Sequence, residues 1–178
     1  SGKGVWVSGL HFKNDLEGLS YCLEMINKNH TILIEEKIVG EEFTLMSYTD
    51  GITVKHMPLV QDFKLLKSGN KGPNTGSMGC ITHSNHSMPF LLKKDIELAK
   101  SVNDDVIKMV NTETNDFYKG IIYGSFIKCK NTGQIKLIEF NCRYGDPECI
   151  NVLELLETNL LDIYTNIVNQ TLNKIDIK

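Results

Sequence analysis

Residues 138–148 read IEFNCRYGDPE, and this segment constrains the architecture more than any other. Its first half alternates apolar and polar residues as a β-strand does, so Glu139 and Asn141, two positions apart, are expected to share one face. Phe140 between them is expected to point into the core. A tight Gly-Asp-Pro-Glu turn follows the polar-faced strand and opens a helix, an arrangement typical of the rim of an active site.

The side chains at positions 139 and 141 have the chemistry of a magnesium site. Carboxylate and amide oxygens are hard ligands, which suit Mg²⁺ when substrate phosphates complete its coordination. Arg143 is expected on the same face, where it could meet phosphate charge; it is the only arginine among 19 basic residues. Because an exposed strand often carries Glu and Asn by chance, the pair indicates a site only together with the turn that follows.

The rest of the chain predicts an α+β fold of antiparallel hairpins flanked by helices. Expected strands are residues 31–35, 42–49, 52–57, 118–129 and 135–141, with turns at 50–51 and 131–133. Expected helices are one capped by Asn14 with Glu17 three residues later, one over residues 94–110, and a helical region from Pro147 with a break near Thr158 and Asn159. Residues 68–89, rich in Gly, Asn, Ser and Pro, predict a long functional or mobile loop.

Four further segments are weak signals when taken singly. The GPNTGSMG run at 72–79 has three glycines that let backbone amides turn toward an anion, and Asp62 and Lys64 place opposite charges two residues apart. The Gly-Lys-Gly tip at 2–4 could close over phosphates. The acidic run at 34–42 could present backbone groups to a heterocycle and carboxylates to a ribose, but it also suits a solvated turn.

Composition excludes several classes of protein. Apolar residues make up 41% and charged residues 23% of 178, the net charge is −3, and no apolar run approaches the ~20 residues of a membrane span, so we expect neither nucleic-acid nor membrane binding. Five cysteines without a CxxC pair predict reduced thiols in the cytosol. Cys80, His83 and His86 lie within seven residues but match no closed zinc pattern, which favours polar residues of a surface loop.

Taken in order, the segments resemble the ATP-grasp module of the phosphoribosylamine–glycine ligase (glycinamide ribonucleotide synthetase) family. That module runs GKGV, IEExxxGEE, QDxK, GPNTGGMG and EFNCR[FY]GDPE, which stand here at residues 2–5, 34–42, 61–64, 72–79 and 139–148. The resemblance covers essentially the whole chain. It implies a partial ATP-grasp fold, with residues 1–60 as part of an ATP-binding lid lobe carrying the adenine segment and 61–178 as the core lobe with the magnesium and substrate sites.

The resemblance also implies a ligase of purine biosynthesis that uses ATP and Mg²⁺, with Mn²⁺ as an alternative, to join glycine to 5-phosphoribosylamine through a glycyl phosphate. Implied ATP-binding residues are Lys3, Gly4, Glu35, Glu36, Ile38 and Glu42. Implied substrate-binding residues are Asn74, Thr75, Gly76, Met78 and Gly79. Implied catalytic residues of the acceptor pocket are Asp62, Lys64, Arg143 and Asp146, and implied metal ligands are Glu139 and Asn141.

Two features separate this chain from the family pattern. Ser77 stands where the motif has its second glycine, which narrows the loop or adds a hydroxyl. We also expect this chain to be a fragment of a cytoplasmic enzyme, without the family's N-terminal and C-terminal domains and inactive alone. Fusion to or association with other purine-synthesis enzymes is left open. The alternatives are another ATP-grasp carbon–nitrogen ligase or carboxylase, and a non-catalytic nucleotide- or metal-binding module that uses Cys80, His83 and His86.

Overall fold

The computed structural model describes residues 5–69 and 71–178. The chain forms two compact units, Ser1–Val39 and Gly40–Lys178. The sequence placed a boundary between residues 60 and 61 instead. Residues 40–60 belong to the second unit because they contain strands that pair with each other and with a strand from the C-terminal half of the chain.

Helix α1 (Asp15–Asn27) is the one helix in the described part of the first unit. It begins as predicted: the side chain of Asn14 accepts a hydrogen bond from the N–H of Glu17 over 3.0 Å, and the Glu17 carboxylate accepts one from the N–H of Lys13 over 2.6 Å. The strand predicted at residues 31–35 does not form. A strand needs a neighbour for its backbone groups, and the described residues of this unit form no strand that could supply one.

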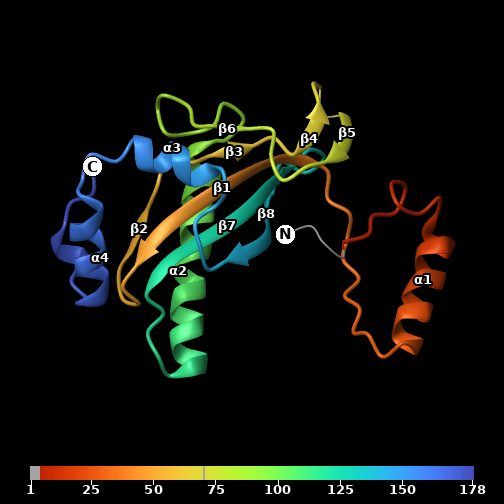
Figure 1. Cartoon of the computed structure of the whole chain (residues 1–178), viewed down its shortest axis with the longest axis horizontal. Helices are drawn as coiled ribbons and strands as arrows, with labels where there is room; N and C mark the ends of the chain where they lie inside the picture. The colour runs from red at the N-terminus through yellow and green to blue at the C-terminus, as the bar shows by residue number, and fades with distance from the viewer. Residues whose placement is uncertain (1–4, 70) are drawn as a thin grey trace. The chain divides into compact units, whose positions relative to one another are not determined.

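The second unit is built on a four-stranded antiparallel sheet in the order β2-β1-β7-β8 (Figure 1). Its strands are β1 (Gly40–Thr49), β2 (Val54–His56), β7 (Gly120–Cys129) and β8 (Ile135–Asn141). Both predicted hairpins are confirmed, one turning at Asp50 and Gly51 and the other at residues 130–134. Gly133 in the second turn has φ of +68°, the left-handed region that glycine adopts without strain.

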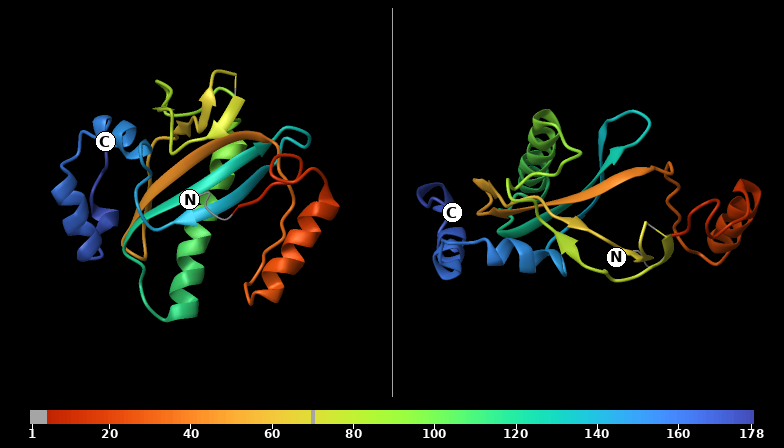
Figure 2. Two further views of the ribbon diagram at one scale, coloured as in Figure 1. Left: turned by 45° about the vertical axis from the view of Figure 1, so that its right-hand side comes forward. Right: turned by 90° about the horizontal axis from the view of Figure 1, so that it is seen from above.

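Helices cover both faces of this sheet (Figure 2). They are α2 (Lys93–Thr114), α3 (Glu148–Glu154), α4 (Leu160–Val168) and the short 3-10 helix η1 (Leu172–Lys174). α2 packs on the face that carries Phe43 and Phe126, whereas α3 and α4 pack on the face that carries Met46 and Tyr123. We call this second side the α3 face. Because both faces are covered, β1 and β7 are buried along most of their length.

The break predicted near Thr158 is confirmed, because it separates α3 from α4. Asn159 caps α4 by accepting a hydrogen bond from the N–H of Leu161 over 2.9 Å. No helix in the described part of the chain is both long and apolar enough to cross a membrane.

Two short strands, β5 (Lys71–Asn74) and β6 (Cys80–Ile81), interrupt residues 68–89, which were predicted as one long loop. Their partners β3 (Gln61–Asp62) and β4 (Leu65–Lys67) lie just before that segment. β3 pairs with β6 and β4 pairs with β5, which gives two small two-stranded sheets. These strands have little apolar alternation, since their residues are only partly buried. Periodicity therefore did not reveal them.

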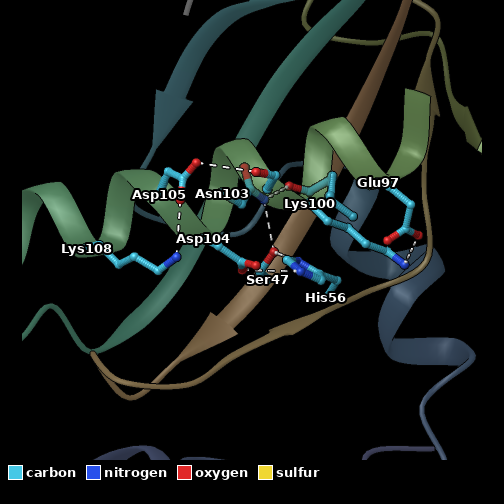
Figure 3. Close-up of polar contacts among 10 residues, drawn as sticks. Ser47, His56, Glu97, Lys100, Asn103, Asp104, Asp105 and Lys108 are labelled. Atoms are coloured by element: carbon cyan, nitrogen blue, oxygen red, sulfur yellow. Dashed lines mark hydrogen bonds and ion pairs between the residues drawn. The ribbon is translucent and has the colours of Figure 1, made fainter. Parts of the chain in front are cut away.

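A buried polar network joins β1 and β2 to α2 (Figure 3). Oγ of Ser47 lies 2.9 Å from Nδ1 of His56, and Nε2 of His56 lies 3.4 Å from Oδ1 of Asp104. The serine, histidine and aspartate are linked in the order of a hydrolase triad. However, Ser47 is fully buried, and its Oγ also accepts a hydrogen bond from Nδ2 of Asn103 over 3.0 Å. No substrate can reach that hydroxyl, so the network serves to hold α2 on the sheet.

This network predicts a loss of stability at mildly acid pH. Burial of the ring lowers the pKa of His56, and the charge of Lys100 acts in the same direction, against Asp104 and Glu97. The unfolded chain therefore takes up the proton more readily, so stability should fall as the pH drops below the ordinary value of 6.5. We expect denaturant unfolding to show this loss in the wild type and a weaker one in His56→Gln. Parallel pH profiles for the two proteins would contradict the prediction.

Candidate functional site

Glu139 and Asn141 lie side by side at the end of β8. Nδ2 of Asn141 donates a hydrogen bond to Oε1 of Glu139 over 3.1 Å, so the two side chains share a face as predicted. Glu139 pairs with Ser125 of β7, and Ser125 pairs with Thr44 of β1. Glu139 and Asn141 therefore both belong to the α3 face. Glu139 is exposed and Asn141 half-buried, so a ligand can approach the pair.

A bulge in β8 decides on which face this pair lies. Ser125 pairs with Glu139, but the next residue, Phe126, pairs with Leu137, so Ile138 is an extra residue in the strand. One extra residue exchanges the two faces of a strand. Without it Glu139 would oppose Gly124, which lies against α2. The bulge thus keeps the Glu139 carboxylate off the face that α2 covers.

The donor set of this pair fits a magnesium ion that is held partly by a substrate. Mg²⁺ is usually bound by one or two protein carboxylates, with phosphate oxygens and waters completing its six ligands. In the described part of the chain no group of three or more His, Cys, Asp or Glu residues is arranged to hold a metal ion. A cation at Glu139 and Asn141 would therefore need further oxygen ligands from a bound substrate or from water.

The metal centre considered for Cys80, His83 and His86 is not assembled. Sγ of Cys80 donates a hydrogen bond to Oδ1 of Asn151 over 3.0 Å, and Nδ1 of His83 lies 2.9 Å from Oδ1 of Asn85. Cys80 and His83 are thus engaged with different partners, and neither they nor His86 belong to a group of three metal-binding side chains among the described residues. The described residues therefore do not support a metal centre at these positions.

The turn after β8 places a carboxylate that the sequence did not single out. Glu148 is 3% exposed, and its Oε1 accepts a hydrogen bond from the Tyr123 hydroxyl over 2.7 Å. The same hydroxyl accepts a hydrogen bond from Oγ1 of Thr44 over 2.9 Å. Burial raises the pKa of Tyr123, which therefore stays protonated as a donor to Glu148. The signal in the sequence was the conspicuous Gly-Asp-Pro-Glu turn, but it did not show which carboxylate would be buried.

Gly145 allows this turn to pass close to the buried carboxylate. A Cβ at this position would lie 2.6 Å from Oε2 of Glu148 and 2.7 Å from the ring of Tyr123, so no larger residue fits. On either side of Gly145 the predicted residues Arg143 and Asp146 are exposed. Nη1 of Arg143 donates to the carbonyl oxygen of Tyr144 over 2.8 Å. The backbone of the turn therefore packs against Glu148 and Tyr123. The charged side chains of Arg143 and Asp146 stay exposed, where a ligand can contact them.

A second group of predicted residues approaches the α3 face from β3. Thr44 of β1 and Val60 exchange backbone hydrogen bonds of 2.8 and 3.1 Å, which aligns the chain leading into β3 with β1. Two residues further, Asp62 therefore lies on the same side as Thr44. Nζ of Lys64 lies 3.3 Å from Oε2 of Glu42, so an ion pair also joins the segment after β3 to β1.

The charges around Asp62 show that separate motifs meet here. Burial raises the pKa of the Asp62 carboxyl, and the negative charges of Glu148 and Glu42 act in the same direction. A hydrogen bond from Ser77 and the positive charge of Lys64 oppose this rise. Residues from β1, the segment after β3, the glycine-rich loop and the start of α3 thus act on one carboxyl group. The structure brings together motifs that are far apart in the sequence.

The glycine-rich loop is fastened to the residues that follow β3. The N–H of Thr75 and its Oγ1 both donate to the carbonyl oxygen of Lys64, over 2.7 and 2.9 Å. The N–H of Met78 donates to the carbonyl oxygen of Phe63 over 2.7 Å. These two amides therefore hold the loop in place rather than facing an anion. A Cβ added at Gly76 would meet nothing within 4 Å, so the loop is open there.

The residues predicted to contact ATP are divided between the two units. Lys3 and Gly4 lie outside the described residues. Glu35 and Glu36 are exposed and Ile38 is half-buried in the irregular segment after α1. Glu42 belongs to β1 in the second unit, where it pairs with Lys64. The predicted ATP contacts thus include residues of both units.

All five cysteines are free thiols, as predicted.

Solved structures of similar shape define the class of fold. Phosphoribosylamine–glycine ligase from Thermotoga maritima superposes with a TM-score of 0.63 at 24% identity, covering 88% of this chain and 40% of that chain. D-alanyl-alanine synthetase A from Vibrio cholerae superposes with a TM-score of 0.52 at 16% identity, covering 79% of this chain and 40% of that chain. The chain has an ATP-grasp fold, as expected.

The sequence itself narrows this class to one family. The chain belongs to the family described as phosphoribosylglycinamide synthetase, ATP-grasp (A) domain, which matches residues 1–149. It is 41% identical to the phosphoribosylamine–glycine ligase of Methanosarcina barkeri over 99% of this chain and 40% of that protein. It is 44% identical to the ligase of Pyrococcus horikoshii over 97% of this chain and 39% of that protein. The chain thus spans about 40% of the length of these curated relatives.

Proposed function

We propose that this chain is the ATP-grasp part of a ligase that joins glycine to 5-phosphoribosylamine through a glycyl phosphate, giving glycinamide ribonucleotide for purine synthesis. The observation that carries the proposal is the 41% identity to a curated phosphoribosylamine–glycine ligase over nearly the whole chain. The convergence of Glu139, Asn141 and Asp62 on the α3 face supports it. A cytoplasmic location, and the possibility of fusion to or association with other purine-synthesis enzymes, belong to the same proposal.

Glu139 and Asn141 would hold Mg²⁺, or Mn²⁺ in its place, together with the phosphates of ATP. The bound cation would neutralise charge on those phosphates. Glu139 and Asn141 lie at the end of β8, where a metal can arrive with its nucleotide. The 3.1 Å hydrogen bond from Nδ2 of Asn141 to Oε1 of Glu139 keeps the two side chains together on one face. Glu42 would bind the ribose hydroxyls from the neighbouring part of the sheet.

The remaining ATP contacts would come from the first unit. Lys3 and Gly4 would close over the phosphates, while Glu35, Glu36 and Ile38 would frame the adenine. In this scheme the lid-lobe role expected for residues 1–60 falls to Ser1–Val39, because residues 40–60 lie in the sheet of the second unit.

The acceptor pocket would be formed by the turn after β8, by β3 and by the glycine-rich loop. Arg143 would bind a phosphate through its planar guanidinium, and Asp146, Asp62 and Lys64 would line the pocket beside it. Loop contacts would come from Asn74, Thr75, Gly76, Met78 and Gly79. No protein nucleophile is required. The chain's own groups align the reactants and stabilise the charge that develops during phosphoryl and acyl transfer.

Replacing Arg143 with Lys tests both this pocket and the proposed reaction. The change keeps the positive charge but removes the two-pronged geometry, so we expect kcat/KM to fall by about tenfold or more. The assay is release of ADP by the full-length ligase that contains this chain, with glycine and phosphoribosylamine both present. Because Arg143 is exposed, the unfolding transition of the Arg143→Lys variant should match that of the wild type.

The same assay contains the outcomes that would overturn the proposal. ADP release that does not depend on glycine, or that occurs with another amino acid but not with glycine, would favour a different carbon–nitrogen ligase. A near-normal rate in Arg143→Lys with a large loss of stability would instead make Arg143 a structural anchor.

A further inference from the structure

The hydroxyl of Ser77 joins the glycine-rich loop to a carboxylate of β3. Its Oγ donates to Oδ1 of Asp62 over 2.5 Å and accepts a hydrogen bond from the N–H of Gly79 over 2.9 Å. Both Ser77 and Asp62 are half-buried. The other hydrogen bonds that hold the loop run between backbone groups or from a hydroxyl to a carbonyl oxygen, so they do not involve the Asp62 carboxylate. Ser77 alone links the loop to that charge among the hydrogen bonds of the described residues.

Glycine at position 77 could not make this link. It would leave the Asp62 carboxylate without the hydroxyl donor, in an environment where burial and the charges of Glu148 and Glu42 disfavour ionisation. Lys64 would be the remaining opposing charge, and it is shared with Glu42 over 3.3 Å. The Ser77 hydroxyl therefore shifts the equilibrium between the charged and neutral forms of Asp62 toward the charged form.

We propose that Ser77 is a positioning residue, whose hydrogen bond fixes the Asp62 carboxylate against the loop and favours its charged form. An ionised carboxylate in this position binds the amine or hydroxyl groups of a polar substrate, while a neutral carboxyl group binds a protonated amine poorly. The hydrogen bond from Ser77 and its effect on Asp62 are properties of the chain itself. Only the consequence of that effect for substrate recognition rests on the proposed function.

The first test measures the titration of Asp62 directly in the 178-residue chain. Aspartate labelled with ¹³C at the carboxyl group is followed by NMR as a function of pH, with Asp62→Asn used to assign the signal. We expect the pKa of Asp62 to rise by about one unit in Ser77→Ala and in Ser77→Gly, because a hydrogen bond to a charged group is lost. Ser77→Thr keeps a hydroxyl and should restore the wild-type value.

Thr75→Val provides the matched control for this titration. It removes a hydroxyl of the same loop that binds the carbonyl oxygen of Lys64 and not Asp62, so the pKa of Asp62 should stay at its wild-type value. An unchanged pKa in Ser77→Ala, or an equal rise in Thr75→Val, would overturn the proposal. The second result would mean that loop packing, and not the Ser77 hydroxyl, controls the carboxyl group.

A second test uses the full-length ligase and its pH dependence. In Ser77→Ala we expect the acid limb of kcat/KM for the amine substrate to move up by the same amount as the NMR pKa, with Ser77→Thr restoring the wild-type profile. A merely structural role would lower the rate without moving that limb, and this result would overturn the positioning role. If the ligase reaction itself is not found, the NMR titration still decides the state of Asp62, so failure of the proposed function is distinguishable.

Discussion

Glu139→Gln is expected to remove Mg²⁺-dependent turnover from the full-length ligase, with a loss in kcat/KM of more than about 100-fold. The substitution removes the negative charge from the β8 pair but changes the volume little. The amide oxygen of a glutamine can still accept the hydrogen bond that Nδ2 of Asn141 donates to Glu139. Because Glu139 is exposed, the free energy of unfolding should be nearly unchanged. Rates measured over a range of Mg²⁺ concentrations test the prediction.

Glu113→Gln is the matched control for this experiment. Glu113 is an exposed carboxylate on α2, the helix that covers the opposite face of the sheet, and it has no proposed role. The same chemical change there should leave both turnover and its Mg²⁺ dependence at wild-type values. If Glu139→Gln keeps near-normal turnover at saturating Mg²⁺, Glu139 is not a required ligand.

Asp50→Ala is expected to lower the free energy of unfolding by about 3 kcal/mol, the largest stability effect we predict. Asp50 is 1% exposed, and its carboxylate accepts hydrogen bonds from three backbone N–H groups. Those of Ile52 and Thr53, at 2.9 and 2.7 Å, close the turn between β1 and β2. That of Leu172, at 2.9 Å, holds the C-terminal segment to the same turn. Alanine would remove the acceptor of all three donors, and the N–H of Leu172, a fully buried residue, could not turn to water instead.

Denaturant unfolding measures this effect, with Asp105→Ala as the control. Asp105 is exposed and pairs with Lys108 on the surface of α2, so its loss should cost at most about 0.5 kcal/mol. Equal effects of the two substitutions would show that the C-terminal segment is not held by Asp50.

The same carboxylate predicts an acid limit to stability. Burial acts to raise the pKa of Asp50, but the hydrogen bonds from Thr53, Ile52 and Leu172 outweigh it, so the pKa lies below its ordinary value of 3.8. The stabilisation is therefore fully present above that value and is lost as the pH falls through the lower pKa of the folded chain. The advantage of the wild type over Asp50→Asn should accordingly shrink below about pH 4.

The sequence alone determined those features that depend on residues close together in the chain. The cap of α1 needs only Asn14 and Glu17, and the two hairpins need only turn residues between strands of alternating pattern. The shared face of Glu139 and Asn141 follows from the two-residue period of a strand. The five motifs were enough to predict the family, because their residue types and spacing are specific even where their individual roles are not.

The tertiary structure decided the features that depend on distant partners. Residues 31–35 have the composition of a strand, but a strand forms only where a neighbour supplies backbone hydrogen bonds. The bulge at Ile138 appears only when β8 is aligned with β7, and it places Glu139 and Asn141 on the α3 face. In the same way, the burial of Glu148 under Tyr123 and the bond from Ser77 to Asp62 join segments far apart in sequence. A single sequence specifies local periodicity directly, whereas such long-range pairings emerge only when the whole chain packs.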